Sequence, residues 1–194
     1  MAKSILLIGR NPMVLANLAS ALTAEDFLVQ TTDQVEQASD QFNAVDFDLI
    51  AFGRGVDEAT NASLKANFSA QNPDVVFVDG LAPVVPLLVK QIKQALVSNQ
   101  TSAKKLIKFT CQQTEQLVVQ VTVTAACQLT IDLYRLDAVH TTHQQTLVSS
   151  FVMAGNHTFR LNEKADSNST INFLAASADK AELLVLPLRT INPT

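Results

Sequence analysis

The chain has 194 residues, of which 47% are hydrophobic and 16% charged, with a formal net charge of −4 at pH 7. This length allows one large domain or two small ones, and net charges of −5 over residues 1–100 and +1 over residues 101–194 exclude the concentrated positive field that nucleic-acid binding needs. No apolar run approaches the length of a membrane span and no signal-peptide pattern precedes the first strand, so we expect no membrane association and a cytoplasmic location.

The first half of the chain predicts four strands of a parallel sheet. Apolar runs are typical of strands buried on both faces, and they predict strands at residues 4–8, 27–29, 48–52 and 75–78. Helical patterns separate these runs, so strand and helix alternate. Right-handed connections then favour a parallel sheet of about four strands with helices on both faces.

Capping residues predict where the helices of this half begin. Asn11 stands at an N-cap position, with Pro12 at the first helical position. Asp33 and Glu36 have the spacing of a capping box, which predicts a helix that reaches about residue 42. Asp57 is predicted to cap a third helix, and a fourth helix is expected from about residue 81 to residue 96.

The hydrophobic pattern changes near residue 100 from a helical period to alternation. Alternation of apolar and polar residues is typical of antiparallel strands with one face in water. The predicted strands, about seven in number, are residues 107–111, 117–124, 127–133, 151–153, 157–159, 170–174 and 182–186. We therefore predict two domains, an α/β domain over residues 1–99 and a small β-sandwich of immunoglobulin-like size over residues 104–194.

Four of the five glycines, Gly9, Gly53, Gly55 and Gly80, follow predicted strands. They are therefore expected at the carboxyl edge of the sheet, where open α/β sheets bind ligands. Two explanations stay open. Either the tight turns from strand to helix need the torsional freedom of glycine, or the glycines belong to a ligand site.

The first half resembles a response-regulator receiver domain over residues 3–97. The matching segments are residues 5–12, which read Ile-Leu-Leu-Ile-Gly-Arg-Asn-Pro, the turn at residues 31–33, and residues 47–50. The resemblance implies a flavodoxin-like sheet. It also implies a truncated one, because the family's fourth helix and fifth strand have no counterpart in this sequence.

The departures from the family pattern imply that its phosphorylation chemistry is missing. Gly9 and Arg10 stand where the family has two acidic magnesium ligands, and Gly53 stands where it has the phosphate-accepting aspartate. Asp79 replaces a hydroxyl residue. Phosphoryl transfer needs an acceptor and charge neutralisation. We therefore expect a pseudo-receiver without a cofactor, not an enzyme, that acts as a signalling or scaffold protein through protein–protein interaction.

A second hypothesis places a ligand at the carboxyl edge. Two arginines beside the helix start would hold a small anion or a nucleotide, because helix N-termini favour anions. The candidate residues for this sensor are Arg10, Asn11, Arg54 and Asp79. In the alternative interpretation, Arg10 and Asp79 pair with each other and leave no site.

Neither a metal site nor a catalytic constellation is predicted. His140 and His143 suggest a metal site with Cys111 and Cys127 as further ligands, but fifteen residues separate the two cysteines, which is unlike zinc-finger spacing. A polar loop or strand edge explains the histidines. Two buried thiols explain the cysteines, since each falls at an inward position of a predicted strand.

The missing fifth strand predicts an exposed edge of the parallel sheet. In the family's strand order the run at residues 75–78 lies at this edge, and it has no charge to discourage pairing with another strand. We expect a homodimer around this strand and the helix at residues 83–96, or alternatively coverage by the β-sandwich of the same chain. The predicted interface residues are Val76, Phe77, Val78, Val85 and Leu88.

Overall fold

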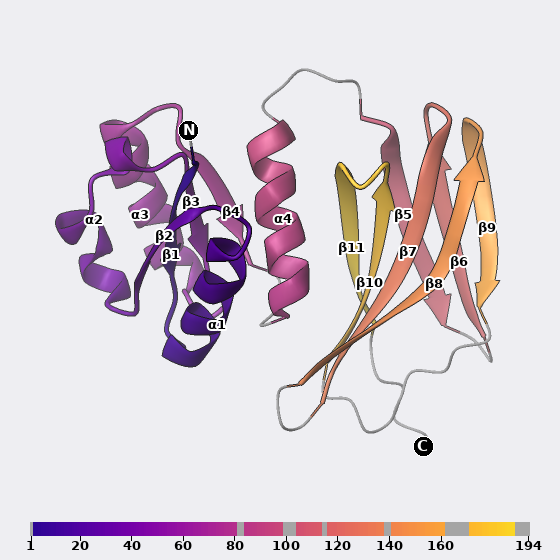
Figure 1. Cartoon of the computed structure of the whole chain (residues 1–194), viewed down its shortest axis with the longest axis horizontal. Coiled ribbons are helices and arrows are strands. Elements are labelled where there is room, and N and C mark those ends of the chain that lie inside the picture. Colours follow the sequence, from indigo (N-terminus) through magenta and orange to yellow (C-terminus); the bar gives the residue numbers. More distant parts are fainter. Residues whose placement is uncertain are drawn as a thin grey trace. The chain divides into compact units, whose positions relative to one another are not determined.

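The computed structural model describes residues 2–80, 84–98, 104–113, 116–137, 141–161 and 171–188. The chain divides into two compact units, Met1–Gln100 and Thr101–Thr194. The first unit alternates strands and helices, and the elements described in the second are all strands (Figure 1). The predicted fold class, α/β followed by all-β, is therefore confirmed.

The α/β unit contains a parallel sheet with the order β2-β1-β3-β4. Its strands are β1 (Ser4–Ile8), β2 (Leu28–Thr32), β3 (Leu49–Phe52) and β4 (Val76–Asp79). Its helices are α1 (Pro12–Thr23), α2 (Ala38–Gln41), α3 (Glu58–Gln71) and α4 (Val85–Ser98), with short 3-10 helices η1 (Val35–Gln37) and η2 (Ala44–Asp46). Within the described residues β4 pairs with β3 alone, so the predicted edge strand is confirmed.

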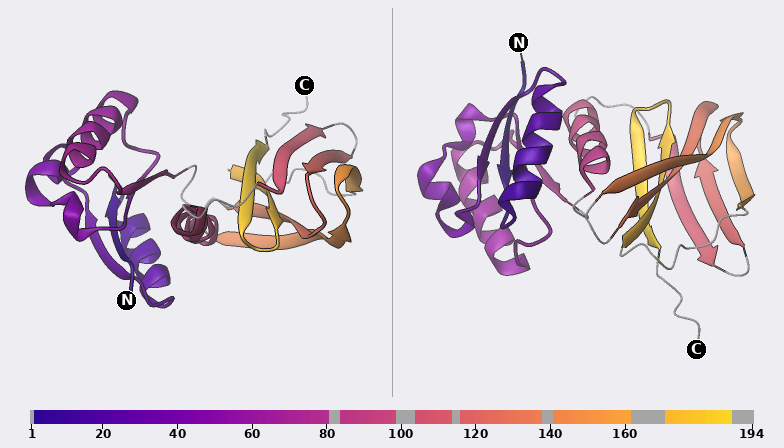
Figure 2. Two further views of the ribbon diagram at one scale, coloured as in Figure 1. Left: turned by 90° about the horizontal axis from the view of Figure 1, so that it is seen from above. Right: turned by 60° about the horizontal axis from the view of Figure 1, so that its bottom comes forward.

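Two apolar cores lie on opposite faces of this sheet, because alternate side chains of a strand point to opposite sides. On one face, Leu7 of β1 shares a core with Leu18 of α1 and Ile92 of α4. On the other face, Ile8 of β1 shares a core with Phe68 of α3. Figures 1 and 2 show α1 on one side of the sheet and α2 and α3 on the other.

Two of the predicted helix starts are confirmed. The side chain of Asn11 accepts hydrogen bonds from the amides of Met13 and Val14 at 3.1 and 3.2 Å, and Pro12 occupies the first helical position. Asp57 caps α3 by accepting from the amide of Thr60 at 2.9 Å. Of the described helices, none combines the length and the apolar character needed to cross a membrane.

The predicted capping box is wrong. Asp33 and Glu36 do not open a continuous helix, because the segment forms the three-residue η1 and then the four-residue α2. The amide of Gln34 donates instead to the hydroxyl of Thr32 at 3.1 Å. The carboxylate of Glu36 is engaged by Arg10, so it cannot complete a box.

The β unit contains seven described strands in two antiparallel sheets, in agreement with the prediction. They are β5 (Leu106–Gln113), β6 (Leu117–Val123), β7 (Cys127–Leu136), β8 (Thr142–Val152), β9 (Gly155–Leu161), β10 (Ile171–Ala178) and β11 (Glu182–Leu188). One sheet has the order β11-β10-β7-β8 and the other β5-β6-β9. The sheets face each other as a sandwich (Figure 2), around a core that includes Val119, Val121, Leu129 and Ile131.

The alternation of residues 107–111 predicts that Ile107 faces inward together with Phe109 and Cys111, and for Ile107 this prediction is wrong. Ile107 is 56% exposed, whereas Leu106 is only 3% exposed and lies in the core. The register between β5 and β6 shifts between Leu106 and Lys108, and such a bulge changes which side chain faces inward. Of the two predicted buried thiols, Cys127 is buried and Cys111 is half-buried against the core.

Candidate functional site

Three neighbouring strands of the parallel sheet end in a row of glycines. Gly9, Gly53 and Gly80 directly follow β1, β3 and β4, and a Cβ built on Gly53 would lie 3.4 Å from the Cα of Gly9. A Cβ on Gly80 would lie 3.8 Å from the Cα of Gly53. None of the three has a positive φ, so torsional freedom does not explain them. The row leaves a strip of main chain without side chains at the carboxyl edge.

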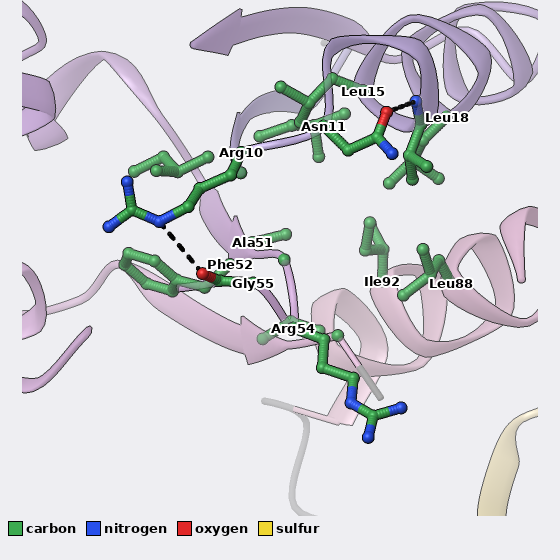
Figure 3. Close-up of a pocket in the computed structure, with 17 residues that line it drawn as sticks. Arg10, Asn11, Leu15, Leu18, Ala51, Phe52, Arg54, Gly55, Leu88 and Ile92 are labelled. Atoms are coloured by element: carbon green, nitrogen blue, oxygen red, sulfur yellow. Dashed lines mark hydrogen bonds between the residues drawn. The ribbon is translucent and has the colours of Figure 1, made fainter. Parts of the chain in front are cut away.

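A pocket of ≈ 470 Å³ opens beside this row, and we call it the edge pocket (Figure 3). Helix α1 contributes Leu15 and Leu18 to its walls, and α4 contributes Leu88 and Ile92. The remaining lining residues are Leu7, Ile8, Gly9, Arg10, Asn11, Val14, Ala51, Phe52, Gly53, Arg54, Gly55, Val78 and Gly80. The lining is therefore mostly apolar, with its polar groups near the strand ends.

Arg10 is held on the α2 side of the strand ends. Its Nε donates to the carbonyl of Gly55 at 3.1 Å, and its guanidinium pairs with Glu36 at 2.5 Å and with Asp57 at 3.6 Å. The hydrogen bond to Glu36 raises the pKa of Arg10 and lowers the pKa of Glu36. The guanidinium points away from Leu15 and Leu18, so this charge is already neutralised by partners outside the edge pocket (Figure 3).

Asp79 does not pair with Arg10, so that interpretation of the sequence is wrong. Its carboxylate accepts from Nζ of Lys65 at 2.7 and 2.8 Å and from Nδ2 of Asn61 at 2.8 Å. Asn61 and Lys65 lie four residues apart on α3, a spacing that places both side chains on one face of the helix. Burial alone would raise the pKa of Asp79, but these hydrogen bonds outweigh it and the pKa is lowered.

The N-terminus of α1 has little capacity left for an anion. The amides of Met13 and Val14 both donate to Oδ1 of Asn11, and Pro12 has no amide hydrogen. Arg54 differs from Arg10, because its exposed guanidinium has no hydrogen bond or ion pair with any other described residue. In Figure 3 its side chain extends in a different direction from that of Arg10.

In the described residues, no three His, Cys, Asp or Glu side chains are arranged to hold a metal ion. His143 lies on the exposed strand β8, where Nε2 is 3.2 Å from the carboxylate of Asp137, and His140 lies outside the described residues. Burial raises the pKa of both thiols, at Cys111 and Cys127. Protonated thiols are poor nucleophiles and poor metal ligands.

Two of the predicted interface residues belong to the core. Val78 and Leu88 are 9% and 8% exposed and pack in the same cluster as α1, so they are not available to a partner. Val76, Phe77 and Val85 are half-buried. The centroid of the Phe77 ring lies 6.1 Å from that of Phe52. The side chains predicted for this interface therefore range from buried to half-buried.

The sequence identified Arg10, Asn11, Arg54 and Asp79 as neighbours of the carboxyl edge, but it missed the side chains that bind Arg10 and Asp79. Glu36, Asn61 and Lys65 supply those partners, and the four-residue spacing on α3 is the local signal that was available. The glycines after the strands were a local signal for the floor of the edge pocket, but its walls had none, because they come from two helices far apart in the chain. No protein-family model matches this chain, and no curated protein matches it.

Proposed function

We propose that this chain is a non-catalytic signalling or scaffold protein whose receiver-like α/β unit is not phosphorylated and acts through protein–protein interaction. The carboxyl edge carries this proposal. Gly53 follows β3, where the resemblance expects the acceptor aspartate, and glycine has no side chain to phosphorylate. Arg10 stands where magnesium ligands are expected, and the nearby carboxylate of Asp79 is held by Lys65. Neither an acceptor nor a magnesium site is present among these residues.

The proposed interaction surface is the free edge of β4, with a second copy of the chain as the partner. This proposal is supported by the position of β4 at the edge of the described sheet and by the uncharged run at residues 75–78. Unpaired main-chain groups on such a strand favour pairing with another strand. Twofold contacts are the commonest way in which identical chains bury a surface of this kind.

The alternative, a sensor of small anions or nucleotides, has less support. Arg10 is engaged by Glu36 and Asp57, and the Asn11 side chain occupies the amides at the start of α1. A phosphate group would find Arg54 as the remaining uncommitted cation among the residues that line the edge pocket. One exposed arginine is a weak site for a small, strongly hydrated anion.

The phosphorylation part of the proposal is tested with acetyl phosphate and Mg²⁺. We expect the intact mass of the full chain to remain unchanged, while a receiver domain with an intact acidic site gains a phosphoryl group in a parallel reaction. The parallel reaction shows that the reagent is active. A phosphoryl adduct on this chain that is lost on mild base treatment, as an acyl phosphate is, would contradict the proposal.

A further inference from the structure

We propose that the edge pocket binds a small organic molecule with a flat apolar body and one anionic group. The body lies over the glycine row between α1 and α4, and the anionic group lies at Arg54. This site is independent of the adaptor role and of the β4 edge, so either proposal can fail without the other. The class of ligand follows from three properties of the pocket: its walls, its floor and its charge.

The walls of the edge pocket favour an apolar ligand. Leu15 and Leu18 face Leu88 and Ile92 across it (Figure 3), and Ala51 of β3 also lines it. The volume of ≈ 470 Å³ lies within the range of pockets that hold small organic ligands. An inorganic phosphate would leave most of this space unfilled. The walls therefore call for a molecule that buries a substantial apolar surface.

The floor of the edge pocket favours a flat body. Gly9 and Gly53 have no positive φ, and a Cβ on either would meet its nearest atoms at 3.4 to 3.6 Å, which is ordinary contact. Neither backbone torsion nor crowding thus requires glycine at these two positions. Gly80 is different, because a Cβ there would lie 3.1 Å from the carbonyl oxygen of Phe52. Two glycines without a structural need leave bare main chain on which a planar group can lie.

The charge at the rim favours a single anionic group. The described residues that line the edge pocket include two arginines and no acidic side chain. Arg10 is paired with Glu36 and Asp57, whereas Arg54 has no partner among the described residues. An anion on the ligand complements Arg54, and a charge-assisted hydrogen bond would fix its orientation.

Two related dyes test this ligand class on the full chain. Anilinonaphthalene sulfonate carries a flat apolar naphthalene ring, an attached aniline ring and one anionic group, and phenylnaphthylamine has the same ring system without the charge. We expect both to bind with enhanced fluorescence, and the sulfonate to bind more tightly. Arg54→Gln should weaken the binding of the sulfonate dye about fivefold and leave the affinity for the neutral dye unchanged. Arg160→Gln, which removes an exposed arginine of β9 in the other unit, is the matched control and should change neither.

Side chains that fill the edge pocket should weaken the binding of both dyes. Ala51→Met extends a flexible side chain from β3 into the pocket, and Gly9→Ala adds one methyl group to its floor at ordinary contact distances. Ala66→Met on the exposed face of α3 is the matched control. We expect an affinity loss of about fivefold or more for Ala51→Met and a smaller loss for Gly9→Ala.

Chemical-shift mapping of the wild-type chain gives an answer even if Ala51→Met fails to fold. The sulfonate dye should shift the amide signals of Gly9, Gly53 and Gly80, and leave those of the β unit unchanged. The proposal is overturned if no dye binds, if the shifted amides lie elsewhere, or if filling the pocket leaves both affinities unchanged. Equal affinities of the two dyes, with no effect of Arg54→Gln, would also overturn it, because the anionic group would then have no role.

Discussion

At the scale of single residues, Asp79 shows how its neighbours control a carboxylate at the carboxyl edge. Lys65 and Asn61 donate hydrogen bonds to it, and Nζ of Lys65 also lies 5.6 Å from the centroid of the Phe52 ring. Burial opposes ionisation and raises the pKa of Asp79, but the hydrogen bonds have the larger effect and lower the pKa below its ordinary value of 3.8. A group with a lowered pKa in the folded state stabilises the fold above its ordinary pKa, and this contribution is lost as the pH falls through the lowered value.

We predict that Asp79→Asn lowers the free energy of unfolding at pH 7 by at most about 1 kcal/mol, because the Asp79 side chain is 59% exposed and solvent screens the pair. The difference from the wild type should shrink as the pH falls below 3.8. Urea unfolding across this pH range measures it. Asp74→Asn, an exposed carboxylate without an ion pair in the described part of the chain, is the control. A difference that grows toward low pH would contradict the interpretation.

The glycine row predicts a contrast between two alanine variants. We expect Gly80→Ala to destabilise the fold by about 1–3 kcal/mol, because its Cβ would lie 3.1 Å from both the Phe52 carbonyl and Cδ2 of Leu88. The carbonyl belongs to a paired strand and has little freedom to move. Gly53→Ala should be neutral, or stabilising by roughly 0.4–1 kcal/mol through the unfolded state. Urea unfolding of both variants measures the two changes in the free energy of unfolding. Equal destabilisation would show that Gly53 is as crowded as Gly80.

At the scale of elements, the two confirmed caps and the failed capping box differ in what competes for the capping side chain. Asn11 and Asp57 accept from amides two or three residues ahead. Glu36 would have had to reach back to its own helix start, but a guanidinium from a residue 26 positions away binds it. The capping bond would carry a charge on the carboxylate alone, whereas the pair with Arg10 carries opposite charges on both partners, so the long-range partner prevails over the local motif.

The Asn11 cap predicts a measurable loss of stability. Asn11→Ala leaves the amides of Met13 and Val14 without their acceptor, and we expect it to cost about 1 kcal/mol in the free energy of unfolding. Asn11→Ser keeps a side-chain oxygen at the cap and should retain most of the stability. Chemical denaturation of the two variants gives the comparison. A serine variant as unstable as the alanine variant would assign the loss to something other than the cap.

At the scale of the whole molecule, the chain joins an α/β unit, whose described sheet ends at β4, to a β-sandwich. The amides of Val76 and Gly80 donate toward β3, to Asp48 and Phe52. Because successive residues of a strand point their amides in opposite directions, the amides of Phe77 and Asp79 face the free edge of the described sheet. These main-chain groups, rather than the buried side chains of Val78 and Leu88, are what a second strand would bind.

We predict a homodimer with twice the chain mass of 21.0 kDa at tens of micromolar. Light scattering measures it, and a monomer over this range would rule out the dimer. If the dimer forms through β4, the amides of Phe77 and Asp79 should exchange hydrogen more slowly as the concentration rises. Exchange that does not depend on concentration in β4 would place the interface elsewhere. Hydrogen exchange is preferable to a charged substitution in β4 such as Phe77→Lys, because that variant would also break the contact between Phe77 and Phe52.

The sequence by itself determined the periodic and local features of this protein. The change of period near residue 100 predicted the two fold classes, and apolar runs predicted the strands of the parallel sheet. The edge position of β4 was expected only from the strand order of the receiver family that the first half resembles. Asn11 and Asp57 predicted two helix starts, because a cap and its amides are neighbours in the chain. Such features depend on contacts over a few residues, which the sequence displays directly.

The tertiary structure alone decided which distant side chains meet. The sequence suggested Asp79 as the acidic partner of Arg10, and the fold placed Glu36 and Asp57 beside it instead. The bulge in β5 turned Ile107 outward although its alternation predicted an inward position. The edge pocket depends on α1 and α4 meeting over the ends of three strands. These outcomes are set by long-range packing and by competition between charges. Neither produces a periodic pattern of residues that could be recognised in the sequence.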